Sequence, residues 1–213
     1  MQTNTDYWEN YLMNQIPESY NIWFKAEKKY LHKHIKRNSR VLEVGCGAGR
    51  SIADILDITT NIVGIDHDSQ AVAEAKQKFS KYKNIKFMET EADDLPFEDK
   101  SFDYVICMTT FANFGKKKYD IINEMKRVLL DNGRIIISVF SQNAFEERMK
   151  VYKDSECKIK EIKGTTVVFE DSLVDNVSEQ FSRSELEEIF TKANLKIKDV
   201  TEVNIAYLCV LSK

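Results

Sequence analysis

The chain is poor in proline and cysteine and has no long hydrophobic run. It contains two prolines and four cysteines in 213 residues. The cysteines lie far apart and form no CxxC pair, so we expect neither a disulfide framework nor a zinc site, and the histidines suggest no other metal. No apolar stretch approaches the roughly 20 residues that span a bilayer, and the first residues lack the pattern of a signal peptide. We therefore expect a cytoplasmic protein with no metal and no membrane partner.

The chain also lacks the basic excess that is typical of nucleic-acid-binding proteins. Its formal net charge is −3, with 31 basic and 34 acidic residues, so we expect no nucleic-acid partner. Residues 25–37 are locally rich in lysine. Trp23, Ala26, Tyr30 and His34 recur there at helical spacing, with lysines between them. This pattern indicates a helix with a solvated basic face rather than a functional basic patch.

The seven glycines are unevenly placed, because Gly45, Gly47, Gly49 and Gly64 fall within twenty residues. Short apolar runs at 40–44, 61–65, 85–88 and 102–108 alternate with stretches of helical periodicity, which favours βαβ units and a mostly parallel sheet. Asn132 and Gly133 predict a turn into a further apolar run at 134–140. We expect helices over 51–57 and 72–82 and a third around 121–129.

We expect one domain over 1–213, with parts of different character. Residues 1–37 predict a helical segment broken near Pro17, and 38–140 carry the alternating strands and helices. Regularity fades over 141–183, which predicts an insertion that forms a cap. Residues 184–213 predict a helix opened by a capping box of Ser184 and Glu187, followed by strands at 195–202 and 205–211.

The strongest motif is VLEVGCGAGR at 41–50, in which a predicted strand runs into three glycines and a helix. Such a loop lets backbone amides approach a polar ligand. Its G-x-G-x-G spacing differs from the dinucleotide fingerprint G-x-G-x-x-G. Asp66 ends the next predicted strand and can accept hydrogen bonds from ribose hydroxyls. A helix cap is the alternative role for an aspartate at this point, and Asp68 and Ser69 compete for it.

Two further segments complete the pattern. The first, ETEADDLPFEDKSFDYVIC at 89–107, contains Leu95-Pro96-Phe97 before a strand, and the second is EMKRVLLDNGRIIIS at 124–138. In this order and spacing, the segments over about 38–140 resemble the motifs of class I S-adenosylmethionine-dependent methyltransferases with an LPF loop. The resemblance implies a Rossmann-like, mostly parallel seven-stranded sheet with helices on both faces and an antiparallel last strand. It also implies S-adenosylmethionine as the cofactor.

The resemblance assigns roles to residues of the first two motifs. Glu43 would order the glycine loop and the amino end of the cofactor's methionine portion. Gly45 and Gly47, with Cys46 between them, would pass close to that portion, and Gly49 would open the helix. Asp66 would bind the ribose, and His67 would lie at the ribose edge.

The resemblance also implies contacts to the adenine and to the base of the site. Glu91, four residues before Leu95, would face the adenine amino group, where aspartate is commoner in the family. Ala92 would offer its backbone amide to the ring, with Asp93 in the same loop. Cys107 and Met108 would lie under the cofactor. Arg127 occupies a frequent family position that we interpret as structural.

Methyl transfer from a sulfonium needs in-line positioning more than a fixed catalytic group. Weak catalytic candidates are Tyr7, Tyr11 and Asn113, although loop packing is the more ordinary role for Asn113. We expect a small-molecule acceptor, with a protein methyltransferase and a non-catalytic cofactor-binding protein as alternatives. A nicotinamide-dependent oxidoreductase is disfavoured by the glycine spacing and by the absence of a Tyr-x-x-x-Lys pair. The methylated atom and the oligomeric state stay open.

Overall fold

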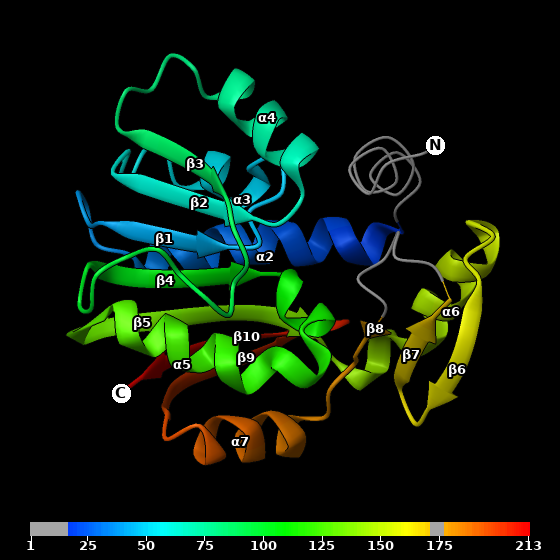
Figure 1. The fold of residues 1–213 in the computed structure, drawn as a ribbon. Coiled ribbons are helices and arrows are strands. Elements are labelled where there is room, and N and C mark those ends of the chain that lie inside the picture. The colour runs from blue at the N-terminus through cyan, green and yellow to red at the C-terminus, as the bar shows by residue number, and fades with distance from the viewer. Residues whose placement is uncertain (1–16, 171–176) are drawn as a thin grey trace.

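The computed structural model describes residues 17–170 and 177–213. Its centre is a sheet that has seven strands in these residues, in the order β3-β2-β1-β4-β5-β10-β9 (Figure 1). The strands are β1 (Val41–Val44), β2 (Ile62–Asp66), β3 (Ile85–Glu89), β4 (Phe102–Met108), β5 (Leu129–Phe140), β9 (Lys196–Val203) and β10 (Ala206–Ser212).

The strand directions confirm a mostly parallel sheet. β1 pairs in parallel with β2 and β4, and β2–β3 and β4–β5 are also parallel. β10 runs antiparallel to both of its neighbours, β5 and β9. All residues of β1 and β10 are buried, as in strands covered on both faces. The fold prediction, including the antiparallel last strand, is confirmed.

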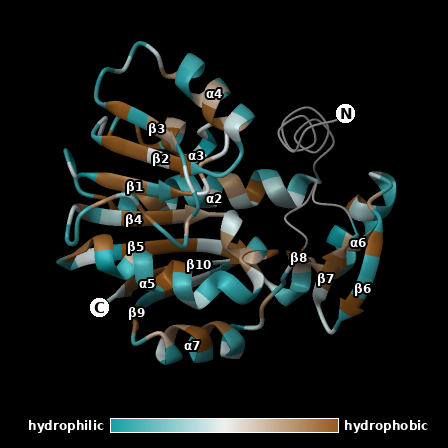
Figure 2. Ribbon diagram, in the orientation of Figure 1, coloured by the Kyte–Doolittle hydropathy of each residue, from teal (hydrophilic) through white to brown (hydrophobic). Residues whose placement is uncertain are grey.

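Helices cover both faces of this sheet: α2 lies behind it and α5 in front in Figure 1. The helices are α2 (Glu18–His34), α3 (Arg50–Asp54), α4 (Ser69–Lys78), α5 (Lys118–Val128), α6 (Phe145–Asp154) and α7 (Arg183–Lys192), with short 3₁₀ turns η2 (Thr110–Asn113), η3 (Gly115–Lys117) and η4 (Gln142–Ala144). Figure 2 shows the strands mostly hydrophobic, whereas the helices carry both hydrophobic and hydrophilic residues. No helix of the described ranges has the length and apolar character that crossing a membrane requires.

The basic helix is arranged as its periodicity predicts. Trp23, Tyr30 and Leu31 of α2 are buried, while the lysines between 25 and 36 are exposed. Trp23 packs edge-on against Phe140, with 4.6 Å between the ring centroids, and its Nε1 donates to Ser138 Oγ at 2.7 Å. α2 is therefore fixed to β5 by its apolar side, and its lysine-rich side faces solvent.

Three local predictions are corrected. The helix expected over 51–57 is the five-residue α3. The turn expected at Asn132 and Gly133 lies inside β5, where Phe102 pairs with Leu129 but Tyr104 pairs with Arg134, so the chain bulges out of the ladder. α7 is capped by Ser182 with Glu185, not by Ser184 with Glu187.

The shift of the cap has a tertiary cause. The pattern Ser-x-x-Glu occurs twice, two residues apart, so local sequence allows both registers. Phe181 forms a β-bridge with Ser141, and its N–H donates to the carbonyl of Phe140 at 3.0 Å. The extended chain is therefore held up to Phe181, which makes Ser182 the first residue available to cap the helix.

Residues 141–183 include a small separate layer, which we name the cap. It contains α6 and an antiparallel sheet of β6 (Ile159–Lys163), β7 (Thr166–Phe169) and β8 (Val177–Ser178). Tyr152, Val167 and Phe169 form its own hydrophobic cluster. Figure 1 places α6, β6 and β7 beyond the carboxyl ends of the parallel strands, on the side where α2 begins.

We expect Ser182→Ala to lower the free energy of unfolding by about 1 kcal/mol, because it removes the acceptor for the Glu185 amide. Ser184→Ala is the matched control and should change stability by less than about 0.5 kcal/mol. Urea unfolding of the two variants measures both. Equal losses would contradict the observed register of the cap.

Candidate functional site

The carboxyl ends of four adjacent strands bring the predicted site residues together. In the sheet, β3, β2, β1 and β4 are neighbours. The glycine loop follows β1, and Asp66 ends β2 opposite Glu89 of β3. Met108 ends β4, the strand on the other side of β1. Because parallel strands end at the same edge, the segments predicted to bind the cofactor lie along one edge of the sheet (Figure 1).

The glycine loop adopts left-handed backbone at all three glycines, and Gly49 has a φ of +83°. Gly45 has a φ of +74°, and a Cβ there would lie 2.3 Å from Thr110 Cγ2. Thr110 Oγ1 donates to the Gly45 carbonyl at 2.9 Å. Gly47 has a φ of +50°, but a Cβ there would meet no atom of the described residues within 4 Å. Gly45 is thus required by packing, whereas Gly47 borders open space.

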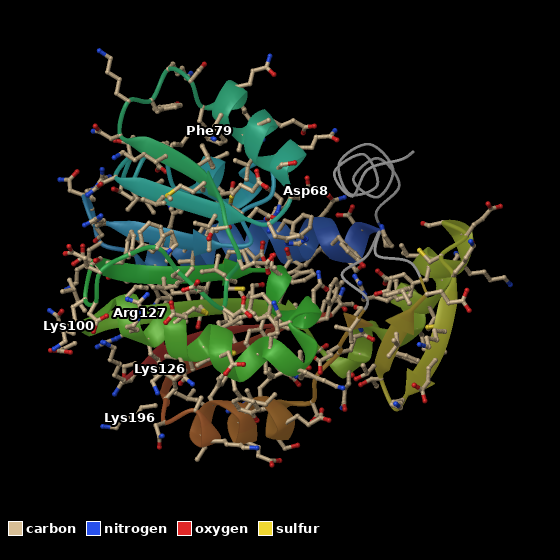
Figure 3. The ribbon with its side chains drawn as sticks, viewed as in Figure 1. Asp68, Phe79, Lys100, Lys126, Arg127 and Lys196 are labelled. Atoms are coloured by element: carbon tan, nitrogen blue, oxygen red, sulfur yellow. The ribbon has the colours of Figure 1, made fainter. Side chains whose placement is uncertain are left out.

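Asp66 connects the end of β2 to this loop. Its Oδ2 accepts from the Gly47 amide at 2.8 Å, and its Oδ1 accepts from the Asp68 amide at 3.0 Å. His67 Nδ1 lies 3.6 Å from Oδ1. The competing capping role belongs to Asp68, labelled in Figure 3, which accepts from the amides at the start of α4. Asp66 is therefore not a helix cap, and its carboxylate faces the glycine loop.

Glu43 lies within the sheet below the loop and is 1% exposed. It accepts a hydrogen bond from Ser51 Oγ, which ties β1 to α3. Burial raises the pKa of Glu43 to about 8, against the opposing effects of Ser51 and Arg50. Burial also raises the pKa of the Cys46 and Cys107 thiols, so neither is prepared to act as a thiolate.

A buried ion pair next to Glu43 was missed by the sequence analysis. Glu27 of α2 is fully buried, and its Oε2 lies 2.7 Å from Arg50 Nη1. Burial raises the pKa of Glu27, and Arg50 partly opposes this effect. The Arg50 guanidinium also lies 4.1 Å from the centroid of the Phe24 ring. The ion pair had a signal in the sequence. Glu27 lies four residues after Trp23, on the apolar side of the predicted helix, where a carboxylate needs a buried partner.

The loop after β3 carries acidic side chains that face a lysine. Glu91 has a 64% exposed side chain, and Asp93 is more buried at 25%. Lys117 Nζ from η3 lies 2.9 Å from Asp93 and 3.5 Å from Glu91. Ala92 between them is partly buried against the core. Lys117, which the sequence analysis did not identify, thus neutralises part of this acidic loop.

Arg127 holds the LPF segment in place. Its Nη2 donates to the Leu95 carbonyl at 2.8 Å and its Nη1 to the Phe97 carbonyl at 2.6 Å. Glu124, paired with Arg127, accepts from the Leu95 amide at 2.8 Å. In Figure 3, Arg127 lies toward the opposite end of the sheet from Asp68. These contacts agree with a structural role for Arg127.

The end of β4 is buried and leads into an unusual backbone conformation. Cys107 and Met108 are 0% and 2% exposed. Thr109 follows with a φ of +71°, which is uncommon for a β-branched residue and often occurs at functional sites. Asn113 is half-buried in η2. Thr109 and Thr110 were not among the predicted site residues, although polar residues directly after a strand were a usable signal.

Two of the weak catalytic candidates, Tyr7 and Tyr11, lie outside the described residues. Within the described residues, no group of three or more histidine, cysteine, aspartate or glutamate side chains could hold a metal ion.

Comparison with known proteins gives one consistent result. A family described as a methyltransferase domain matches residues 35–194. Demethylmenaquinone methyltransferase from Staphylococcus aureus is 29% identical over 132 residues, which cover 59% of this chain and 52% of that protein. The chain therefore spans about half the length of that relative.

Solved structures extend the similarity to nearly the whole chain. A crystal structure of a Pyrococcus horikoshii protein is 25% identical, with a TM-score of 0.73 and 92% coverage of each chain. The 1,6-didemethyltoxoflavin-N1-methyltransferase of Burkholderia thailandensis, solved with 1,6-didemethyltoxoflavin and S-adenosylhomocysteine, has a TM-score of 0.71 at 17% identity, covering 98% of this chain and 85% of that chain. At this identity the second similarity shows the shared fold alone.

We expect the stability of the cofactor-free protein to fall as pH rises from about 5 to 8, in part because of Glu43. Its pKa is about 8 in the fold and about 4.3 in an unfolded chain. Between these values the folded state holds a proton that the unfolded state releases, so the free energy of unfolding decreases by up to about 1.4 kcal/mol per pH unit. Glu43→Gln should flatten this slope in urea unfolding.

The matched control for this experiment is Glu188→Gln, which changes an exposed carboxylate of α7. Its slope should equal that of the unmodified protein. If Glu43→Gln and Glu188→Gln gave the same slope, Glu43 would not be the buried acid that we describe.

Proposed function

Since the chain belongs to the methyltransferase domain family and is an S-adenosylmethionine-dependent methyltransferase, we propose that the carboxyl edge of β1–β4 holds the cofactor. We further propose that the methyl group is transferred to a small-molecule acceptor. In this proposal Gly45, Cys46, Gly47 and Gly49 approach the methionine portion, above Glu43. Asp66 and His67 take the ribose.

The observation that carries the cofactor proposal is the open space at Gly47 beside the Asp66 carboxylate. A Cβ on Gly47 would have no neighbour within 4 Å among residues 17–170 and 177–213, although its amide donates to Asp66 Oδ2 at 2.8 Å. Each carboxylate oxygen has two lone pairs, so Asp66 keeps acceptor capacity for hydroxyl donors of a ribose. The Asp66 carboxylate can accept hydrogen bonds from a sugar, and Gly47, which has no side chain, leaves room for that sugar.

The adenine side of the proposal rests on Glu91, Ala92 and Asp93. Lys117 contacts both carboxylates and would orient this loop. Arg127 fixes the loop from its other side through the Leu95 and Phe97 carbonyls. Cys107 and Met108 are buried at the end of β4, so we propose that they support the floor of the site rather than react.

The cofactor supplies an electrophilic methyl group on its sulfonium, so the chain's task is to position an acceptor and exclude water. The cap and the start of α2 lie at the edge where β1–β4 end (Figure 1). We propose that they enclose the acceptor. Asn113 in η2 is a candidate to orient it, and Tyr7 and Tyr11 remain candidates outside the described residues.

The small-molecule class is supported by one relative and by the charge of the chain. The relative from Staphylococcus aureus is named for demethylmenaquinone, a small molecule. The net charge of −3 gives no general attraction to nucleic acid. Because that relative is matched over only about half its length, we carry over the class of acceptor and not the acceptor itself.

We expect Gly47→Ala to weaken binding of S-adenosylhomocysteine at least tenfold in a calorimetric titration, because the new methyl group would fill space that the ligand uses. Gly164→Ala is the matched control: Gly164 has a φ of +59° and, in the part of the chain that the structure describes, a Cβ there meets nothing within 4 Å, but it lies in the cap hairpin. Both variants should lose about 1 kcal/mol of stability from left-handed backbone. Equal affinity in the two variants would contradict the proposed cofactor position.

We expect methyl-labelled S-adenosylmethionine to transfer its label into the small-molecule fraction of an extract from cells that naturally contain this enzyme. The extract is separated by size after the reaction, and heat-inactivated enzyme serves as the control. Label found only in the protein fraction would replace the small-molecule proposal with protein methylation.

A further inference from the structure

Arg148 is a buried cation at the junction of the cap, α2 and β5. It lies on α6 and is 2% exposed. Its guanidinium lies 3.8 Å from the centroid of the Phe140 ring, and Phe140 is the last residue of β5. Its Nη1 donates to Tyr20 Oη of α2 at 3.1 Å. Arg148 therefore lies at the carboxyl edge of the sheet, one strand beyond β4.

The remaining partners of Arg148 are also neutral hydroxyl groups. Nε donates to Tyr152 Oη at 2.7 Å, and Nη2 donates to Tyr152 Oη and to Ser178 Oγ, the latter at 3.0 Å. Gln180 Nε2 donates to the same Ser178 oxygen at 2.9 Å. These bonds occupy four of the five N–H groups of the guanidinium. None of the partners carries a negative charge.

The lack of a counter-ion distinguishes Arg148 from the other buried ionisable groups of the described residues. Glu27 is paired with Arg50 at 2.7 Å, and Lys118 with Glu179 at 2.7 Å. Glu43 is buried with a pKa of about 8, so it is mostly protonated at neutral pH. Within residues 17–170 and 177–213, no carboxylate pairs with Arg148. Buried charges in proteins are normally paired, so this position is suited to an anion from outside the chain.

The groups around Arg148 keep hydrogen-bond donors for a ligand, and Gln180 Oε1 is a nearby buried acceptor without a partner in the described structure. The guanidinium can only donate, and the Tyr20 hydroxyl that accepts from it keeps its own O–H. Ser141 follows Phe140 directly, and its Oγ is buried without a hydrogen-bond partner in the described structure. An oxyanion can accept from these donors, and guanidinium groups bind carboxylate and phosphate oxygens particularly well.

We propose that Arg148 recognises the acceptor by an oxyanion, so that the acceptor is an anionic small molecule bearing a carboxylate or a phosphate. This inference rests on the proposed small-molecule function. Arg148 comes from the cap and Phe140 from the strand next to β4, so the anion would bind beside the proposed methyl-donor position and not within it. The charge on Arg148 then selects the acceptor while the glycine loop binds the cofactor.

The first test separates the small-molecule extract by anion exchange before the labelling reaction. Label is expected in the pool retained by the resin, and label confined to the neutral and cationic pool would overturn the proposal while leaving the small-molecule function intact. If no small-molecule pool is labelled, the proposed function itself fails. Treating the anionic pool with a phosphatase distinguishes the two sources: loss of label assigns a phosphate, and persistence assigns a carboxylate.

The second test measures the Arg148→Gln variant with the labelled anionic pool. The apparent KM should rise at least tenfold, with kcat within about twofold and unchanged binding of S-adenosylhomocysteine. Arg148→Lys, which keeps the charge, should recover part of the affinity. Arg183→Gln, which removes an exposed arginine paired with Glu187, is the control. An unchanged KM in Arg148→Gln and Arg148→Lys, with loss of stability only, would show that Arg148 merely joins the cap to the core.

Discussion

The hydrogen bond from the Gly47 amide to the Asp66 carboxylate is the contact on which the arrangement of the site depends. It joins the loop after β1 to the end of β2, and the parallel pairing of the two strands brings the partners within 2.8 Å. The second oxygen of Asp66 holds the Asp68 amide, so one side chain fixes both the glycine loop and the start of α4. The geometry of this edge thus follows from sheet topology and one half-buried carboxylate.

Buried ionisable side chains lie beneath the glycine loop and support the site. Glu27, Glu43 and Arg50 meet where α2 crosses the base of α3 and β1, so the N-terminal helix is coupled electrostatically to the glycine loop. Glu27 is paired with Arg50, whose charge also acts on Glu43, and burial favours the protonated form of each acid. Glu43 connects stability to pH because its pKa is higher in the fold than in an unfolded chain.

Much of the sheet edge that we propose for the cofactor could be predicted from the sequence, because its signals are local. A strand, a glycine loop and an acidic residue at the next strand end lie within about 25 residues, between Val41 and Asp66. The register of the α7 cap could not be predicted, since two Ser-x-x-Glu patterns are locally equivalent and the bridge between Ser141 and Phe181 selects one. The bulge in β5 is likewise decided by pairing with β4, which overrides the turn propensity of Asn132 and Gly133.

The residues of the proposed acceptor site are far apart in the sequence, unlike those of the proposed cofactor site. Tyr20 and Arg148 are 128 residues apart in the chain, and Ser178 is 30 residues further on. No periodicity or motif links residues at such separations, so their meeting depends on the docking of the cap against α2 and β5. A site assembled in this way can change its charge by substitution in the cap without altering the glycine loop. In our proposal, cofactor binding depends on the local motif, and acceptor choice depends on tertiary contacts centred on the buried Arg148.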